Sequence, residues 1–208
     1  MQPTKFKINY DINLKTKEFS ETVDKIIKDF DITDIFETGT YNGLGSTTVF
    51  AKTGKYVVTV EANYTNFITA IKNLAEYQNV CVVHALSLDR ETLIKTLMET
   101  KFDVETTYDS KFPKTFYLRE VIQSVVLEDA LNLFVKNELK QLIFLDSAGG
   151  VGFEEFKEVM AMNLKNKVLM LDDIDHFKHV QSVKYLEENG YQVNKSSDNR
   201  FAWCVLNK

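Results

Sequence analysis

Residues 37–51 read ETGTYNGLGSTTVFA, a glycine-rich stretch directly behind the short apolar run of residues 34–36. Three glycines and the hydroxyl residues 46–48 lie here between an acidic residue and an apolar segment. This composition fits a surface loop. It fits equally a loop whose backbone closely approaches a phosphate, a nucleoside or an amino-acid carboxylate. The flanking patterns predict a short strand before the loop and a helix after it.

The chain of 208 residues is long enough for one α/β domain, and its 44% apolar and 26% charged residues are those of a soluble globular protein. A formal net charge of −5 argues against nucleic acid as a partner, because phosphate binding needs a basic face. Cys81 and Cys204 lie in apolar runs and are predicted to be buried. No signal peptide or membrane-span pattern is found, so we expect a cytoplasmic protein without a membrane partner.

Strand-like and helix-like patterns alternate along the chain. Five apolar strands, each followed by a helical segment, predict right-handed crossovers and a parallel sheet. We therefore expect a single domain over 1–208: a Rossmann-like, doubly wound α/β fold with a mostly parallel seven-stranded sheet, an antiparallel terminal strand and helices on both faces. Residues 1–31 form an N-terminal helical extension. The five predicted parallel strands cover residues 34–38, 56–61, 80–87, 141–146 and 167–172.

Residues 100–119 have no clear period, contain one of the two prolines and are dense in aromatic residues. A loop this long is uncommon in a compact domain unless it is functional or disordered, and aromatic residues argue against disorder. We interpret the segment as a lid or substrate wall. An insertion that packs on the core is an equal alternative.

Polar side chains follow the predicted strands at the point where each strand ends. In an open parallel sheet, ligands bind at the carboxyl ends of the strands, beside the switch in strand order. This edge is therefore the predicted active site. The side chains that the strands deliver there are, in chain order, Glu37, Glu61, Ser87, Asp146, Asp172 and Asp173.

Glu61 lies 22 residues after Gly39, near the spacing of about 20 at which an acidic residue on the second strand binds ribose hydroxyls. The glycine pattern does not fit a dinucleotide, because G-x-G-x-x-G would need a glycine at Tyr41. It does not fit a P-loop either, because no Gly-Lys-Ser/Thr follows. A nucleoside that carries an amino-acid tail therefore fits better than NAD, and a free ribose argues against NADP.

The run E-T-G-T-Y-N-G-L-G-S-T, then V-T-V-E-A-N, then a serine at the end of the third strand, resembles the cofactor half of class I S-adenosylmethionine-dependent methyltransferases. The closest branch is that of the catechol-type small-molecule O-methyltransferases, whose first loop commonly reads E-x-G-x-Y-x-G. The resemblance covers about residues 20–190 in element order, and only the first loop and the Glu61 strand are specific at motif level.

The resemblance implies that the first loop holds the methionine portion of S-adenosylmethionine, that Glu61 binds the ribose and that Ser87 lies near the adenine. Members of this branch are often dimers, so a homodimer is implied as an option. The predicted cofactor-binding residues are Glu37, Gly39, Tyr41, Gly43, Ser46, Glu61, Ser87 and Asp146.

Catechol-type enzymes hold a divalent metal with an aspartate ending the fourth strand and an Asp-Asn or Asp-Asp pair ending the fifth. The resemblance therefore implies a metal site at Asp146, Asp172 and Asp173, whose hard oxygens suit Mg²⁺. Such a metal lowers the pKa of a bound hydroxyl and so creates the nucleophile. The alternative is that Asp172 and Asp173 cap the last helix.

One position departs from this family. The catechol-type lysine three residues after the fourth-strand aspartate, a general base, is replaced by Gly149. A metal could make the base dispensable, or His176 or His179 could replace it. These histidines lie three residues apart on one face of the helix predicted over 176–190, and solvated surface histidines are the alternative.

The sequence thus predicts methyl transfer from S-adenosylmethionine to a small-molecule acceptor, at an oxygen, with Mg²⁺ as a further cofactor and Asp146 and His176 as catalytic residues. A second hypothesis keeps the cofactor but transfers the methyl group without metal, to nitrogen or to a sugar hydroxyl. A third is a methyltransferase-like module that binds a nucleoside or a partner without catalysis.

Overall fold

The computed structural model describes residues 16–99, 114–124, 126–148 and 150–206. The first part of the predicted N-terminal extension and most of the predicted lid lie outside the described residues. Where the lid segment is described, residues 114–119 belong to a helix, α5 (Lys114–Gln123), that the sequence patterns did not predict.

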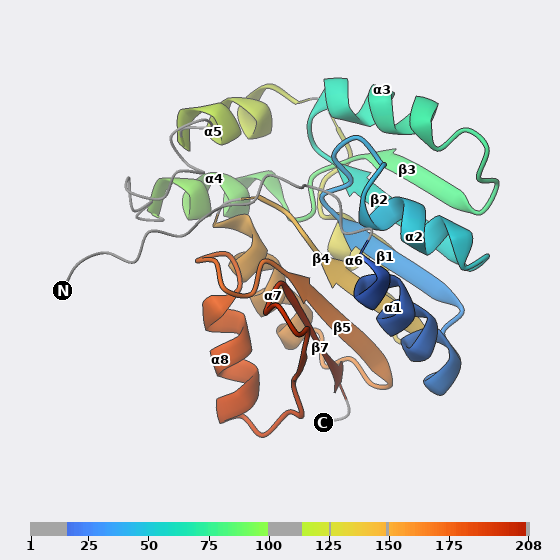
Figure 1. Ribbon diagram of the computed structural model, residues 1–208. Coiled ribbons are helices and arrows are strands. Elements are labelled where there is room, and N and C mark those ends of the chain that lie inside the picture. The colour runs from blue at the N-terminus through green and yellow to red at the C-terminus, as the bar shows by residue number, and fades with distance from the viewer. Residues whose placement is uncertain (1–15, 100–113, 125, 149, 207–208) are drawn as a thin grey trace.

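A seven-stranded sheet forms the centre of the molecule, with helices on both of its faces (Figure 1). Its order is β3-β2-β1-β4-β5-β7-β6. Strands β1 to β5 are parallel, and β7 is antiparallel to both of its neighbours, so the predicted fold is confirmed. The strands are β1 (Asp34–Thr38), β2 (Tyr56–Glu61), β3 (Val80–His84), β4 (Gln141–Leu145), β5 (Lys167–Asp172), β6 (Asn194–Lys195) and β7 (Phe201–Leu206).

Eight helices are found in the described residues, and none combines the length and the apolarity that crossing a membrane requires. Side-chain oxygens cap two of these helices: Asn63 accepts from the backbone N–H of Asn66 at 3.0 Å, and Asp89 from that of Thr92 at 2.9 Å. The helices are α1 (Lys17–Asp29), α2 (Ser46–Lys52), α3 (Tyr64–Asn73), α4 (Arg90–Glu99), α5 (Lys114–Gln123), α6 (Ala130–Phe134), α7 (Val151–Ala161) and α8 (Val180–Glu188).

Two apolar layers enclose the sheet because successive side chains of a strand point to opposite faces. Ile35 of β1 packs with α1 and α2, whereas the next residue, Phe36, packs with α4, α6, α7 and α8. The ring of Phe19 in α1 lies 5.2 Å from that of Phe201 and 5.7 Å from that of Phe144. The N-terminal helix is therefore part of the core.

The strand predicted over residues 80–87 is present as β3 but ends at His84, and its predicted burial is wrong. β3 is an edge strand, because the crossover after β2 leads to the outside of the sheet, and its residues are mostly half-buried. Cys81 is exposed, so the predicted burial of the cysteines holds for Cys204 alone. His84 stacks on Phe67 with ring centres 4.9 Å apart, and its Nε2 lies 3.1 Å from the backbone oxygen of Ala62.

The last helix begins later than predicted, at Val180. Turns and a bend occupy residues 174–179 before the helix start, after a left-handed φ of 52° at Asp173. His176 and His179 therefore do not share a helix face. Asp172 and Asp173 do not cap α8 either, so the capping alternative is wrong.

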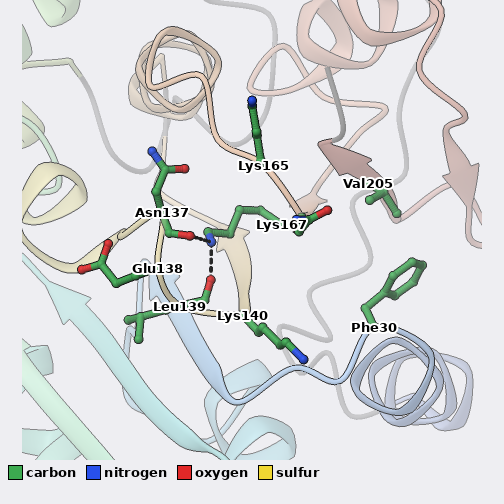
Figure 2. A pocket seen from close by; sticks show the side chains of 9 residues that line it. Phe30, Asn137, Glu138, Leu139, Lys140, Lys165, Lys167 and Val205 are labelled. Atoms are coloured by element: carbon green, nitrogen blue, oxygen red, sulfur yellow. Dashed lines mark hydrogen bonds between the residues drawn. The ribbon is translucent and has the colours of Figure 1, made fainter.

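A cavity of about 430 Å³ opens at the amino ends of β4 and β5, on the opposite side of the sheet from the carboxyl ends where the predicted site lies (Figure 2). Its buried Lys167 donates from Nζ to the backbone oxygens of Asn137, at 2.9 Å, and Leu139. Burial lowers the pKa of Lys167. The ammonium thus satisfies carbonyls of the turn before β4, and the cavity lies away from the candidate site.

Gly39 connects the loop after β1 to the end of β4. Its φ is +80°, and a Cβ atom there would lie 2.5 Å from the backbone oxygen of Asp146. Gly54 has a similar φ of +72° but no atom within 4 Å of the same position. The two glycines therefore separate the cost of a left-handed backbone from the cost of a collision.

We expect Gly54→Ala to lower the free energy of unfolding by about 1–2 kcal/mol, the cost of placing a Cβ in the left-handed region. Gly39→Ala should cost roughly 1–3 kcal/mol more, because the two backbones must move apart. Urea denaturation of both variants measures the difference. Equal losses would contradict the close approach of the loop to β4.

Candidate functional site

The carboxylate of Glu37, at the end of β1, is fully buried among three hydroxyl groups. Thr47 at the start of α2 donates to Oε2 at 2.6 Å, Thr59 of β2 donates to the same oxygen at 2.7 Å, and Ser46 donates to Oε1. Burial raises the pKa of Glu37, and the three hydroxyl donors oppose that rise. Both oxygens are thus engaged within the protein, and cofactor contact by Glu37 and Ser46 stays a prediction.

The glycine-rich loop is shaped by contacts within the protein. Gly43 has a φ of +77°, and a Cβ there would lie 2.7 Å from Cδ1 of Leu74, at the carboxyl end of α3. Tyr41 also has a positive φ, 52°, and its side chain is 48% exposed. The loop therefore packs down between β4 and α3 while Tyr41 stands at its rim.

Glu61, at the end of β2, is buried and joins this loop to the start of α3. Its Oε2 accepts from the backbone N–H of Tyr41 at 2.7 Å, and its Oε1 accepts from that of Asn63 at 2.8 Å. Desolvation raises the pKa of Glu61 to about 7, against the lowering effect of the two backbone donors. A ligand hydroxyl that donates to this carboxylate would favour its ionised form.

A second fully buried carboxylate, Glu155 of α7, was missed from the sequence. Its Oε2 accepts from the hydroxyl of Thr38 at 2.9 Å. Burial raises its pKa, and the nearby hydroxyls of Ser147, Ser87 and Thr38 oppose the rise, while its Oε1 is buried without a hydrogen-bond partner in the described part of the chain. Ser87 thus interacts with Glu155, and its predicted position near an adenine stays a prediction. The signal was present in the sequence, because Glu155 stands in the same buried stripe as Phe156.

The three predicted metal ligands come together at the ends of β4 and β5. One oxygen of each of Asp146, Asp172 and Asp173 lies within 4.8 Å of the others. In the described part of the chain, this is the one group of three His, Cys, Asp or Glu side chains that could hold a metal ion.

Two cations that the sequence did not reveal lie among these aspartates. Nζ of Lys178 is 2.7 Å from Oδ1 of Asp146 and 3.2 Å from Oδ2 of Asp173. On the other side, the guanidinium of Arg200 binds both oxygens of Asp172, at 2.8 and 2.9 Å, and its Nε lies 3.0 Å from Oδ1 of Asp173. The spacing of Lys178 and Arg200 along the chain carries no signal, because turns bring both of them to the strand ends.

In this arrangement the triad fits the two cations better than it fits Mg²⁺. Mg²⁺ demands near-ideal octahedral oxygen coordination at about 2.1 Å. Here an ammonium already lies within hydrogen-bonding distance of two of the three carboxylates. Although burial alone would lower the pKa of Lys178, Asp146 and Asp173 raise it above its ordinary value, so this group is charged.

The two histidines differ in environment. His179 is fully buried, its Nδ1 lies 3.2 Å from Oγ of Ser182, and burial lowers its pKa well below the ordinary value. The prediction of a surface position is therefore wrong for His179, and its burial does not fit a base that reaches an acceptor. His176 is half-buried, with its ring centre 4.2 Å from that of Phe177. Its catalytic role stays a prediction.

The raised pKa of Glu61 makes a prediction about stability. The carboxyl proton of Glu61 is bound more tightly in the folded protein than in the unfolded chain, where its pKa is 4.5. The resulting stabilisation is therefore complete below pH 4.5 and is lost as the pH rises through about 7. We expect the wild type to lose roughly 3 kcal/mol relative to Glu61→Gln between pH 4.5 and pH 8.

Denaturant unfolding of both proteins across this range measures the effect. Glu76→Gln, at an exposed glutamate in the turn after α3, is the matched control and should follow the wild type. A constant difference between wild type and Glu61→Gln would show that Glu61 has an ordinary pKa.

Comparison with known proteins supports the fold. No protein-family model matches the sequence, and no curated protein is similar to it in sequence. Solved structures do match. A proposed O-methyltransferase from Klebsiella pneumoniae is 13% identical, with 93% of this chain and 81% of that chain covered and a TM-score of 0.55.

Two further structures agree with it. A proposed caffeoyl-CoA O-methyltransferase from Staphylococcus aureus is 16% identical, over 92% of this chain and 84% of that chain, with a TM-score of 0.54. An O-methyltransferase from Bacillus cereus in complex with S-adenosylhomocysteine is 14% identical, over 91% and 81%, with a TM-score of 0.52. The chain therefore shares the fold of S-adenosylmethionine-dependent methyltransferases, as the sequence motifs predicted.

Proposed function

We propose that the chain binds S-adenosylmethionine at the carboxyl ends of β1 and β2 and transfers its methyl group to an oxygen of a small-molecule acceptor. The observation that carries this proposal is the position of Glu61. Its carboxylate is held at the rim of the glycine loop by the backbone N–H groups of Tyr41 and Asn63. A carboxylate oxygen can accept more than one hydrogen bond, so the two oxygens can also receive both hydroxyls of a ribose.

The other residues have supporting roles in this proposal. The loop around Gly39, Tyr41 and Gly43 receives the methionine portion, and Ser87 lies on the adenine side. Glu37 and Ser46 support the loop without a direct role in catalysis. Their mutual hydrogen bond holds the start of α2 against β1 and so gives the loop one conformation. Such preorganisation reduces the ordering cost of binding.

The chemistry is a displacement at the methyl carbon. The acceptor oxygen attacks that carbon, the carbon–sulfur bond breaks with its electron pair returning to sulfur, and the hydroxyl proton passes to a base. We propose Asp146 for this proton, with His176 as the second candidate. The side chain of Asp146 is 22% exposed, and its backbone lies against Gly39 of the cofactor loop. The protein's main contribution is to hold oxygen, carbon and sulfur in line.

The predicted Mg²⁺ does not enter this scheme, because Lys178 already binds two of the carboxylates that would hold it. When bound, such an ion would supply Lewis-acid activation of the acceptor hydroxyl.

A second candidate function is a nucleoside-binding or partner-binding module without catalysis. It is favoured by Gly149, which stands where catechol-type enzymes carry a basic lysine, and by the burial of His179. Formation of S-adenosylhomocysteine in the presence of candidate acceptors distinguishes the two functions, since a module would bind the cofactor and never turn it over.

Calorimetric titration with S-adenosylhomocysteine tests the binding step. The wild type should give saturable heat, and Glu61→Ala should weaken binding by about 10- to 100-fold, the loss of hydrogen bonds to a charged acceptor. Glu76→Ala, at an exposed site, is the control and should bind as the wild type does. No heat at millimolar ligand would refute the proposal. Unchanged affinity in Glu61→Ala would mean that the ribose lies elsewhere.

Proton release gives an independent readout of the same contact. Free Glu61 is partly protonated near pH 7, and ribose hydroxyls that donate to it favour the ionised form, so binding should release a proton. The observed heat at pH 6.5 should then change with the ionisation enthalpy of the buffer. This dependence should disappear in Glu61→Gln. A buffer-independent heat in the wild type would contradict the contact.

A further inference from the structure

We propose that Lys178 takes the place of a divalent metal ion in the acidic triad of Asp146, Asp172 and Asp173, so that methyl transfer by this chain needs no metal. The catalytic part of this inference rests on the proposed function. The charge substitution itself does not, because it concerns only how the protein neutralises its own carboxylates.

The position of the ammonium is the first observation. Nζ of Lys178 bridges two of the three carboxylates, at 2.7 Å from Asp146 and 3.2 Å from Asp173. These carboxylates belong to different strand ends, β4 and β5, and their oxygens lie within 4.8 Å of each other. A divalent ion bound to the triad would have to lie in the space between these oxygens. The ammonium therefore competes directly with such an ion.

Packing holds the lysine in that position. Its side chain is 4% exposed, unlike that of a mobile surface ion pair. The stem of Lys178 passes directly over Gly152 of α7, where a Cβ atom would lie 2.6 Å from Cγ of the lysine. The same Cβ would lie 3.0 Å from the ring of His179. The absence of a side chain at Gly152 thus leaves room for the lysine to reach the aspartates.

The remaining charge is compensated from the other side. Arg200 binds Asp172 through two hydrogen bonds and also contacts Asp173, so each aspartate has a cationic partner. Burial raises the pKa of Asp146 well above its ordinary value, and the charge of Lys178 opposes that rise, so the ammonium favours the ionised carboxylate. Displacement of the ammonium would leave it buried without acceptors, which is costly. We therefore expect the triad of the wild type to bind a metal ion only weakly.

In this arrangement Lys178 is a positioning residue for Asp146. It fixes the carboxylate at the strand end whose backbone touches Gly39 of the cofactor loop. Two internal contacts, one to the side chain and one to the main chain, thus align the proposed proton acceptor with the proposed cofactor site.

Metal binding tests the inference without cofactor or acceptor. Titration of the purified protein with MnCl₂, followed by electron paramagnetic resonance and calorimetry, should show no saturable binding to the wild type below millimolar concentration. Lys178→Ala leaves the three carboxylates without their shared ammonium, so it should bind Mn²⁺ at least about tenfold more tightly than the wild type. Lys184→Ala, at an exposed lysine of α8, is the matched control and should not gain binding.

Lys178→Gln, which keeps most of the side-chain stem but removes the charge, is the second variant in case Lys178→Ala does not fold. It should also gain Mn²⁺ binding, and Mn²⁺ should raise its melting temperature but not that of the wild type. Saturable micromolar Mn²⁺ binding to the wild type that Asp146→Asn abolishes would overturn the inference. Failure of both folded lysine variants to gain binding would also overturn it.

The outcome for the proposed function is separate. If the protein binds no S-adenosylhomocysteine yet the lysine variants gain Mn²⁺ binding, the charge substitution stands and the proposed function fails. If the cofactor binds and the wild type also takes up Mn²⁺ at the triad, the proposed function stands and the inference fails.

Discussion

Two buried carboxylates hold the carboxyl end of β1, and the candidate site depends on them. Glu37 points to one face of the sheet and binds hydroxyls from α2 and β2, while its neighbour Thr38 points to the other face and donates to Glu155 of α7. A buried carboxylate is costly unless hydrogen-bonded, so Glu37 holds its three hydroxyl partners firmly in place, and Glu155 holds Thr38 through one oxygen. The glycine loop therefore starts from a strand end that is fixed on both faces, and the positions of Gly39, Tyr41 and Glu61 follow from it.

The edge of the sheet carries two environments side by side. Among the described residues, no cation is bonded to the carboxylate of Glu61, which backbone N–H groups hold and which suits the neutral hydroxyls of a ribose. At the ends of β4 and β5 the carboxylates are bound to Lys178 and Arg200 instead. In both environments the fold places acidic residues at the carboxyl ends of strands. The chemistry available to each then depends on which cations the loops supply, because a paired carboxylate and an open one differ in affinity for a metal.

Much of the fold could be predicted because it depends on local patterns. The apolar runs of β1, β2, β4 and β5 mark buried strands, and Asn63 and Asp89 mark helix starts, since both signals lie within a few residues of each other. β3 was misjudged because a β-branched run is compatible with an edge strand as well as with a central one. The start of α8 was misjudged because the chain turns inward at Lys178 and His179. This turn pairs Lys178 with Asp146, after β4, and uses the space that Gly152 leaves free, and both of these residues are distant in sequence.

The sequence alone determined that the chain forms a doubly wound sheet, that acidic side chains gather at one edge, and that the first loop suits a nucleoside with an amino-acid tail better than a dinucleotide. Those conclusions follow from periodicity and from the spacing of Gly39 and Tyr41, in the loop after β1, to Glu61 at the end of the adjacent strand β2. Only the tertiary structure decided which carboxylates are already neutralised. Glu155, Lys178 and Arg200 reach the strand ends from helices and turns that are remote in sequence, and the electrostatic state of a site depends on distances of a few ångströms that no local pattern encodes.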